Sequence, residues 1–282
     1  MSTKTLRTLN LRCWSGFEAA IQKLENERQV KNGRLLHPPL FRGHGSNKWK
    51  LETTLERSHP SECGRPEVSF LEYYRTASAA KPVIETLSGK TRRDIPDYPT
   101  FMRELEDNTS TWLDVLMFKH AAVVEYFVYL RHHGFPSPLL DWTASPYVAA
   151  FFAFDSPSRN AKRVCIYALL QDQIHGGSSD AHLFVVGQYM RSHPRHFQQQ
   201  CQYTMCVALD SRNRDYVFRT HQSGLQEALG PNGKLVAITI PIGERITALR
   251  HLERMNINAF SLFGSEDSLI RTIARRELLL RE

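Results

Sequence analysis

The sequence predicts one α+β domain, because it combines a strong helical pattern with short strand-like runs and contains no internal repeat or clear linker. Residues 111–133 carry apolar side chains at the three- and four-residue spacing of a helix that faces a core. Residues 164–170 and 235–242 are short, rich in β-branched side chains and bounded by helix breakers, which is typical of buried strands. We therefore expect strands packed against helices around one core.

The other elements follow from local signals, taken in chain order. Ser15 and Glu18 form a capping-box pattern before an apolar helix. Residues 40–43 are extended and end at a glycine, and residues 66–80 form a second helix. Residues 81–110 are rich in proline, threonine and charge, which predicts a long surface excursion.

In the second half of the chain, the ends of the predicted helices and strands are marked more clearly. The long helix ends at Gly134, and residues 139–143 form a short strand or turn. Ser145, followed by proline, caps an apolar helix that extends to Phe154. Residues 266–280 form a helix at the C-terminus.

Composition excludes several classes of protein. The 282 residues are 41% hydrophobic and 23% charged, which argues against a disordered chain. No apolar stretch is long enough to span a bilayer, and the first ten residues contain no secretory signal. Five cysteines without a CxxC pair indicate reduced thiols, so we expect a cytoplasmic protein. The net charge of +7 favours polyanionic partners.

Standard catalytic and nucleotide motifs are absent. The sequence contains no Walker phosphate loop, no GxGxxG, no GxSxG and no HExxH. His193, His196, Cys201 and Cys206 have the residue types of a zinc site, but their spacing matches no usual finger pattern. We therefore expect no metal.

Two segments carry unusual residues. Arg42 follows a short strand and precedes two glycines, an arrangement that suits bidentate capture of a phosphate or pairing with a core carboxylate. Asp141 is either an acid, a base or an orienting group, or else a buried carboxylate bonded to backbone or to His132 or His133. Trp142 either stacks on a flat ligand or packs in the core.

Together these segments resemble the FRG domain family. Its Phe-Arg-Gly signature stands at residues 41–43, and Trp49-x-Leu51 and Arg57 follow as in the family pattern. The family's second block is similar to residues 131–146, although Arg131, Ser137 and Pro138 depart from it. The matching positions there are His132, Gly134, Pro136, Leu139, Leu140, Asp141, Trp142, Thr143, Ser145 and Pro146.

Two later blocks are less specific. A third block is similar to Gln199, Tyr203 and Thr204, with Cys201 in place of the expected glycine, and a last block is similar to residues 261–267. The resemblance implies one FRG domain over residues 1–282, with an inserted variable segment near 81–110.

The order of these blocks also resembles the Arg–Ser–Glu plan of mono-ADP-ribosyltransferases. That likeness implies a split mixed sheet flanked by helices, with NAD⁺ as substrate. The implied catalytic residues are Arg42 and a late carboxylate, Glu266 or Asp267, which also suit the first turn of a helix. The residues implied to bind NAD⁺ are Arg42, Gly43, His132, Asp141, Trp142, Thr143 and Ser145.

The resemblance therefore predicts an NAD-dependent ADP-ribosyltransferase that acts inside cells as a toxin or an anti-phage defence effector. Its acceptor would be nucleic acid, such as RNA, or protein, and an antitoxin protein is an expected partner; no membrane is expected. A non-catalytic module that binds NAD or nucleic acid is the first alternative. A nuclease using Asp141, His132 and His133 is the second.

Overall fold

The computed structural model of the chain describes residues 6–27, 37–58, 68–106, 121–170, 181–187, 190, 194–210, 215–222, 224–225 and 235–281. The strands in these ranges form one open mixed sheet, in the order β1-β8-β4-β2-β3-β6-β5, with β7 also pairing β6. β1 pairs β8 in parallel and the other neighbours are antiparallel. The strands are β1 Leu6–Asn10, β2 Leu40–His44, β3 Leu140–Thr143, β4 Arg163–Leu169, β5 Ala181–Val186, β6 Cys201–Asp210, β7 Asp215–Phe218 and β8 Leu235–Pro241.

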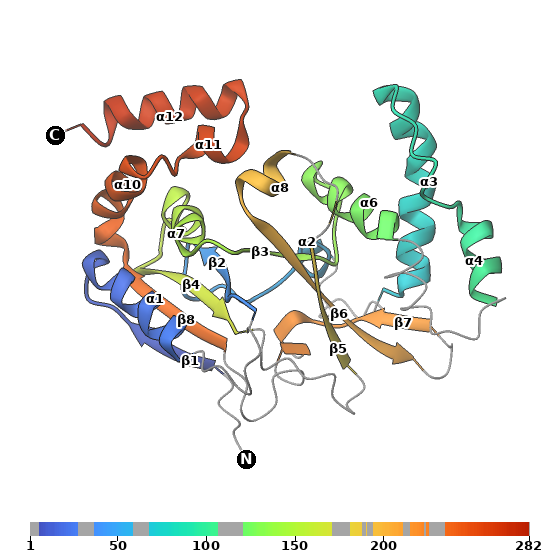
Figure 1. Cartoon of the computed structure of the whole chain (residues 1–282), viewed down its shortest axis with the longest axis horizontal. Helices are drawn as coiled ribbons and strands as arrows, with labels where there is room; N and C mark the ends of the chain where they lie inside the picture. The colour runs from blue at the N-terminus through green and yellow to red at the C-terminus, as the bar shows by residue number, and fades with distance from the viewer. Residues whose placement is uncertain are drawn as a thin grey trace, which may run out of the picture.

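Helices pack against this sheet in two groups, seen at the two ends of the molecule in Figure 1. One group packs over β4 and β8, and the other over β6 and β7. The predicted α+β class is therefore confirmed. The helices are α1 Phe17–Asn26, α2 Thr54–Ser58, α3 Phe70–Ser88, α4 Tyr98–Glu106, α6 Ala121–His132, α7 Pro146–Asp155, α8 Pro194–Gln198, α10 Arg245–Arg254, α11 Ala259–Phe263 and α12 Glu266–Leu278.

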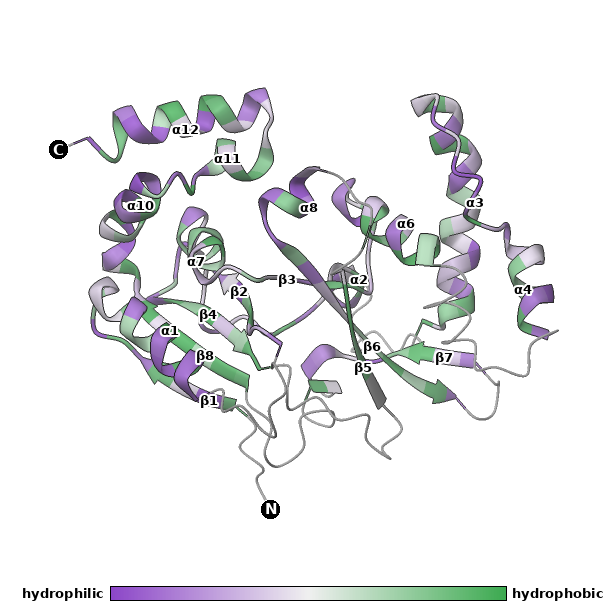
Figure 2. Cartoon of the chain, in the orientation of Figure 1, coloured by the Kyte–Doolittle hydropathy of each residue, from purple (hydrophilic) through white to green (hydrophobic). Residues whose placement is uncertain are grey.

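The buried strands have apolar side chains on both faces. Ile166 of β4 faces the core under α1, α7 and α10, whereas its neighbour Tyr167 faces a second core on the other side of the sheet. Figure 2 shows the hydrophobic colouring along β8, and along α12 hydrophobic residues alternate with hydrophilic ones. This double burial explains why residues 164–170 and 235–242 are so uniformly apolar.

The pairing between neighbouring strands is shortest at the centre of the sheet. β2 and β3 are neighbours in the sheet, but they share only one residue pair, Phe41 with Thr143. On their outer sides both strands are fully paired, β2 with β4 and β3 with β6. The two halves therefore diverge beside Arg42, at the point where the two helix groups also separate.

The predicted helices are found where the structure describes them, but two other expectations are wrong. The capping box at Ser15 is wrong: α1 begins at Phe17 after a 3-10 turn, and no side chain caps it. The backbone N–H of Trp14 instead donates to the carboxylate of Glu244 at 2.9 Å. Glu18 remains in the first turn of α1.

The expectation of a loop over residues 81–110 is also wrong. α3 extends to Ser88, and α4 occupies Tyr98–Glu106. The fully buried Phe101 anchors α4 against Tyr74 of α3, with ring centroids 4.5 Å apart. Aromatic contacts of Phe101 and Tyr98, together with the buried Ile95, thus give this polar segment its place in the core. Residues 59–67 and 107–120, where two of the predicted helices were expected to begin, lie outside the described residues.

Gly43 is required by packing between β2 and α7. A Cβ atom at this position would lie 1.9 Å from the carbonyl oxygen of Ala149 and 2.7 Å from the backbone nitrogen of Ala153. We expect Gly43→Ala to lower the free energy of unfolding by about 1–3 kcal/mol or more, because helix backbone must move. Gly243→Ala is the matched control, since nothing lies within 4 Å of its Cβ. Equal urea midpoints for the two variants would contradict this role.

Candidate functional site

A cleft of about 440 Å³ opens where β2 and β3 diverge. Residues from both halves of the sheet and from five of the described helices line it, so the cleft lies at the junction of the two helix groups. They are Phe41, Arg42, Gly43, Gly45, Trp49, Thr54, Arg131, His132, Asp141, Trp142, Thr143, Phe152, Ser156, Arg195, Gln199, Cys201 and Phe263. Six of the nine residues predicted from the sequence are in this set.

Arg42 is one of the arginines that line the cleft. Its Nε donates to Nε2 of His44 at 3.0 Å, and its Nη1 donates to the backbone carbonyl of Asp141 at 2.7 Å. Both acceptors are uncharged, and Arg42 forms no ion pair with any residue that the structure describes. Its positive charge is therefore not neutralised by a carboxylate in direct contact. Burial lowers the pKa of Arg42 to about 10, so the guanidinium still carries its charge at neutral pH.

His44 accepts the hydrogen bond from the Nε of Arg42. Its side chain is buried, and burial together with the charge of Arg42 lowers its pKa to about 3. The ring is therefore neutral and its Nε2 can accept a hydrogen bond. The same ring packs edge-on against Tyr167, with centroids 5.2 Å apart. Sequence reasoning missed this role, although His44 directly follows the Phe-Arg-Gly segment.

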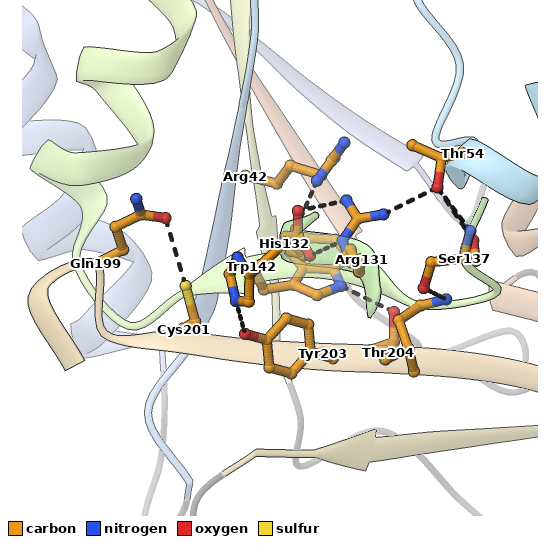
Figure 3. A network of polar contacts seen from close by, with 12 residues as sticks. Arg42, Thr54, Arg131, His132, Ser137, Trp142, Gln199, Cys201, Tyr203 and Thr204 are labelled. Atoms are coloured by element: carbon orange, nitrogen blue, oxygen red, sulfur yellow. Dashed lines mark hydrogen bonds and ion pairs between the residues drawn. The ribbon is translucent and has the colours of Figure 1, made fainter. Parts of the chain in front are cut away.

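Asp141 has a different partner from the one expected. Its carboxylate accepts two hydrogen bonds from the guanidinium of Arg131, and Figure 3 shows that guanidinium between Arg42 and Thr54. Burial would raise the pKa of Asp141, but the charge and hydrogen bonds of Arg131 outweigh burial and lower it. Arg131 also donates to the hydroxyl of Thr54 at 3.2 Å. His133 is exposed, and its ring packs at a tilt against Tyr129, with centroids 4.4 Å apart.

The next three predicted residues have mainly structural contacts. Trp142 is 2% exposed, and its indole N–H donates to the hydroxyl of Thr204 at 2.9 Å. The hydroxyl of Thr143 donates to the carbonyl of Gln199. Ser145 is the N-cap of α7, as predicted, and is not among the residues that line the cleft.

The structure does not bring Glu266 and Asp267 into the cleft. Both are exposed in the first turn of α12, whose N-cap is Ser265. Phe263, two residues before that cap, is the last residue of the chain that reaches the cleft lining. Two carboxylates in a first turn are favoured by the helix dipole, which accounts for their position.

Several lining residues were not predicted. Trp49 is 48% exposed, and its ring lies 6.2 Å from that of His44. Phe152 of α7 meets Phe263 edge-on, with ring centroids 6.0 Å apart. Arg195 of α8 lies with its guanidinium 5.6 Å from the centroid of Phe263. Trp49 belongs to the Trp-x-Leu segment, so its signal was present in the sequence. Phe152 and Phe263 look like ordinary core residues in the sequence.

The suspected zinc ligands do not converge among the described residues. No group of three or more metal-binding side chains occurs in that part of the chain. His196 is bonded to Tyr203, and Cys201 donates to the side chain of Gln199. His193 lies outside the described residues.

The buried His221 pairs with Glu56 and contacts the Thr204 hydroxyl that accepts from Trp142. The backbone N–H of His221 donates to Glu56 at 2.7 Å, and its Nδ1 lies 3.8 Å from the same carboxylate. Its Nε2 lies 3.0 Å from the hydroxyl of Thr204, which also holds Trp142. Burial alone would lower the pKa of His221, but Cys206 and Glu56 outweigh it and raise the pKa to about 10.

This raised pKa predicts a pH-dependent stability. Between the unfolded pKa near 6.5 and about 10, only the folded state holds the proton, so stability is greatest below 6.5 and falls as the pH rises. We expect a slope of about 1.4 kcal/mol per pH unit in urea unfolding between pH 7 and 8.5. His221→Gln should flatten that slope. An equally steep slope in this variant would assign the effect to another group.

The fold and the cleft define an α+β domain in which an arginine without an ion-pair partner among the described residues lies at the divergence of two central strands. Residues 37–162 match the model of the FRG domain family, so the FRG resemblance is confirmed for this part of the chain. The matched stretch holds Arg42, His132 and Asp141, and it ends before Glu266. No curated protein and no solved structure matches the chain, and the likeness to ADP-ribosyltransferases is not confirmed. No helix in the described ranges is long and apolar enough to cross a bilayer.

Proposed function

We propose that the cleft binds NAD⁺ and that the protein is an NAD-dependent ADP-ribosyltransferase. The observation that carries this proposal is Arg42, whose charge is held beside the cleft by two uncharged acceptors. A pyrophosphate supplies the missing anion, and a planar guanidinium suits bidentate contact with it. The volume of about 440 Å³ is within the range of small-molecule sites.

Aromatic side chains support a ligand with flat rings. Trp49 lines the same cleft as Arg42, and Phe152 and Phe263 form a further apolar wall. Rings such as nicotinamide or adenine gain free energy by packing on these faces. Arg195 adds a second positive charge near that wall. The net charge of +7 favours nucleic acid, including RNA, as the acceptor of the ADP-ribosyl group, with protein as the other acceptor class.

A non-catalytic NAD-binding module is the second candidate, and one observation favours it. Asp141 is the only carboxylate among the described cleft residues, and it is already paired with Arg131. Glu266 and Asp267 lie outside. A transferase with this cleft must therefore promote loss of nicotinamide through Arg42, Asp141 and the substrate's own groups.

The experiment is to measure NAD⁺ binding and NAD⁺ consumption separately. Isothermal titration of the full chain with NAD⁺ tests the site, and release of nicotinamide in the presence of RNA, DNA or protein fractions tests the reaction. Binding with release supports the transferase, and binding without release supports the binding module. Absence of binding overturns both. A toxin or defence role predicts that expression of the wild type arrests growth and that an Arg42→Lys variant does not.

The late carboxylates give a discriminating prediction. Because Glu266 is exposed outside the cleft, we expect Glu266→Gln to leave nicotinamide release within about two-fold of wild type, as for ordinary surface substitutions. Asp267→Asn should behave in the same way. A loss of about 10²-fold in either variant would restore the role implied by the family resemblance and would require α12 to approach the cleft.

A further inference from the structure

The helix α12 has polar side chains on its inward side and apolar side chains on its outward side. Ser268 and Thr272 are buried, whereas Ile270 and Ile273 are 59% and 49% exposed. A helix that packs on its own domain normally turns its apolar side to the core. In Figure 1 α12 lies at the edge of the molecule, above α11. Packing within the chain therefore does not account for the two exposed isoleucines.

Polar contacts hold the inward side of α12 in place. The hydroxyl of Thr272 accepts from the backbone N–H of Phe260 at 3.0 Å and donates to the carbonyl of Ser268 at 2.8 Å. The guanidinium of Arg275 pairs with the carboxylate of Asp155. These contacts fix the rotation of α12 about its axis, so the same residues always face outward.

The outward side is chemically self-complementary about the midpoint between Ile270 and Ile273. Asp267 stands three residues before Ile270, Arg276 stands three residues after Ile273, and both are exposed. When two copies of a helix run antiparallel about a two-fold axis at this midpoint, each residue meets the one equally far beyond the midpoint in the other copy. Ile270 then meets Ile273, and Asp267 meets Arg276.

The residues that flank the isoleucines also match in size. Leu269 and Ala274 are exposed and lie at equal distances from the same midpoint. A helix turns by about 100° per residue, so these two side chains lie on opposite flanks of the isoleucine pair. The two-fold axis therefore brings Leu269 of one copy beside Ala274 of the other. A large side chain beside a small one allows two helices to approach closely.

The charges of the outward side allow the same pairing. The carboxylate of Asp267 has no ion-pair partner among the residues that the structure describes. The guanidinium of Arg276 pairs with Glu253, but its side chain is 49% exposed. Because a guanidinium has five N–H groups, Arg276 can bind a second carboxylate. Asp267 of another copy can therefore join this ion pair.

One like-charged contact in this arrangement is compensated. Glu266 in the first turn meets Glu277 of the other copy, since both lie equally far from the midpoint. The guanidinium of Arg281 lies 3.5 Å from the carboxylate of Glu277 and supplies a cation at this contact. Antiparallel helices also place the positive end of each dipole beside the negative end of the other.

We propose that the outward side of α12 is the interface of a homodimer, in which two copies of the chain pair antiparallel about a two-fold axis. A second copy is the partner because a single facing sequence supplies an arginine for Asp267, an aspartate for Arg276 and isoleucines for the centre. The thirteen residues of α12 span about 20 Å, which gives an interface at the small end of the specific range. The dimer therefore dissociates on dilution. This inference does not rest on the proposed function.

The first test is sedimentation velocity of the full chain over a range of concentrations. The wild type should approach twice the mass of the chain as its concentration rises. Ile270→Glu should remain monomeric at concentrations where the wild type is a dimer, because it brings two carboxylates into the apolar centre. Val83→Glu is the matched control, since Val83 is a 70% exposed apolar residue on α3. It should dimerise like the wild type.

A charge exchange tests the antiparallel arrangement. Asp267→Lys places a lysine opposite Arg276, and Arg276→Glu places a glutamate opposite Asp267. Each variant alone should dimerise at least about ten-fold more weakly, because like charges meet twice across the axis. An equimolar mixture of the two variants should recover wild-type affinity as a heterodimer, because both contacts then join opposite charges. Thermal unfolding checks that Arg276→Glu, which also loses its contact with Glu253, is folded.

Three outcomes would overturn the proposal. The first is a wild type that stays monomeric at about 1 mM, where even weak association is visible. The second is a dimer that forms equally well in Ile270→Glu, which would place the interface elsewhere. The third is a monomeric wild type that floats with phosphatidylserine vesicles while Ile270→Glu does not, which would assign this side of α12 to a membrane surface.

Discussion

Trp142→Ala is expected to lower the free energy of unfolding by about 3–5 kcal/mol, the range for removing a large aromatic side chain from a core. Trp142 is 2% exposed and packs with Leu40, Leu140 and Cys206 on the face of the sheet opposite α7. Its loss also leaves the hydroxyl of Thr204 without its indole donor. Trp142→Phe keeps most of the volume and should lose less. Urea unfolding at fixed pH measures both.

A comparison with Trp49 separates core packing from ligand binding. Trp49 is 48% exposed in the same cleft, so Trp49→Ala should change the free energy of unfolding by about 0.5 kcal/mol or less. If a ligand ring stacks on it, the same variant should weaken NAD⁺ binding by about 1–3 kcal/mol. A Trp49→Ala variant as unstable as Trp142→Ala would contradict this division of roles.

Local sequence signals succeeded where neighbouring residues decide the structure. The start of α7 at Pro146 depends on the Ser145 hydroxyl, which accepts from the backbone N–H of Val148 only three residues later. The end of α6 depends on Gly134, whose positive φ of 86° suits glycine. Such interactions are contained in a few consecutive residues, so the pattern alone predicts them.

Local sequence patterns failed to predict elements whose position depends on residues far away in the chain. Trp14, in the 3-10 turn before α1, is bonded to Glu244, 230 positions away in the chain, and no local pattern contains that partner. β6 was missed because both of its faces are buried, so its residues do not alternate between apolar and polar. The partner of Asp141 had a visible signal, however. Arg131, one of the residues that depart from the FRG pattern, stands ten residues before the aspartate it binds.

The cleft residues likewise divide into those that a local pattern predicts and those whose place depends on the whole fold. Arg42 was found because its own tripeptide is distinctive, but its lack of a carboxylate partner is a property of the whole fold. The placement of Glu266 was inferred from chain order, and chain order does not fix where a helix begins relative to a cleft. The structure places Phe263 at the lining and α12 beyond it.

Arg42→Lys is expected to weaken NAD⁺ binding by about 1–3 kcal/mol, and urea unfolding of the same variant measures separately what the loss of its own hydrogen bonds costs. Lysine keeps the positive charge but offers a point charge in place of a planar fork, so it cannot donate to His44, to the carbonyl of Asp141 and to a pyrophosphate together. Arg254→Lys is the matched control, because Arg254 is exposed on α10 and does not line the cleft. Isothermal titration with NAD⁺ and with inorganic pyrophosphate measures the effect. Both ligands should lose affinity in Arg42→Lys and neither in Arg254→Lys, because the contact that is removed is to the phosphate oxygens that the two ligands share. Wild-type affinity for both ligands in Arg42→Lys would remove Arg42 from the binding site and, with it, the observation on which the proposed function depends.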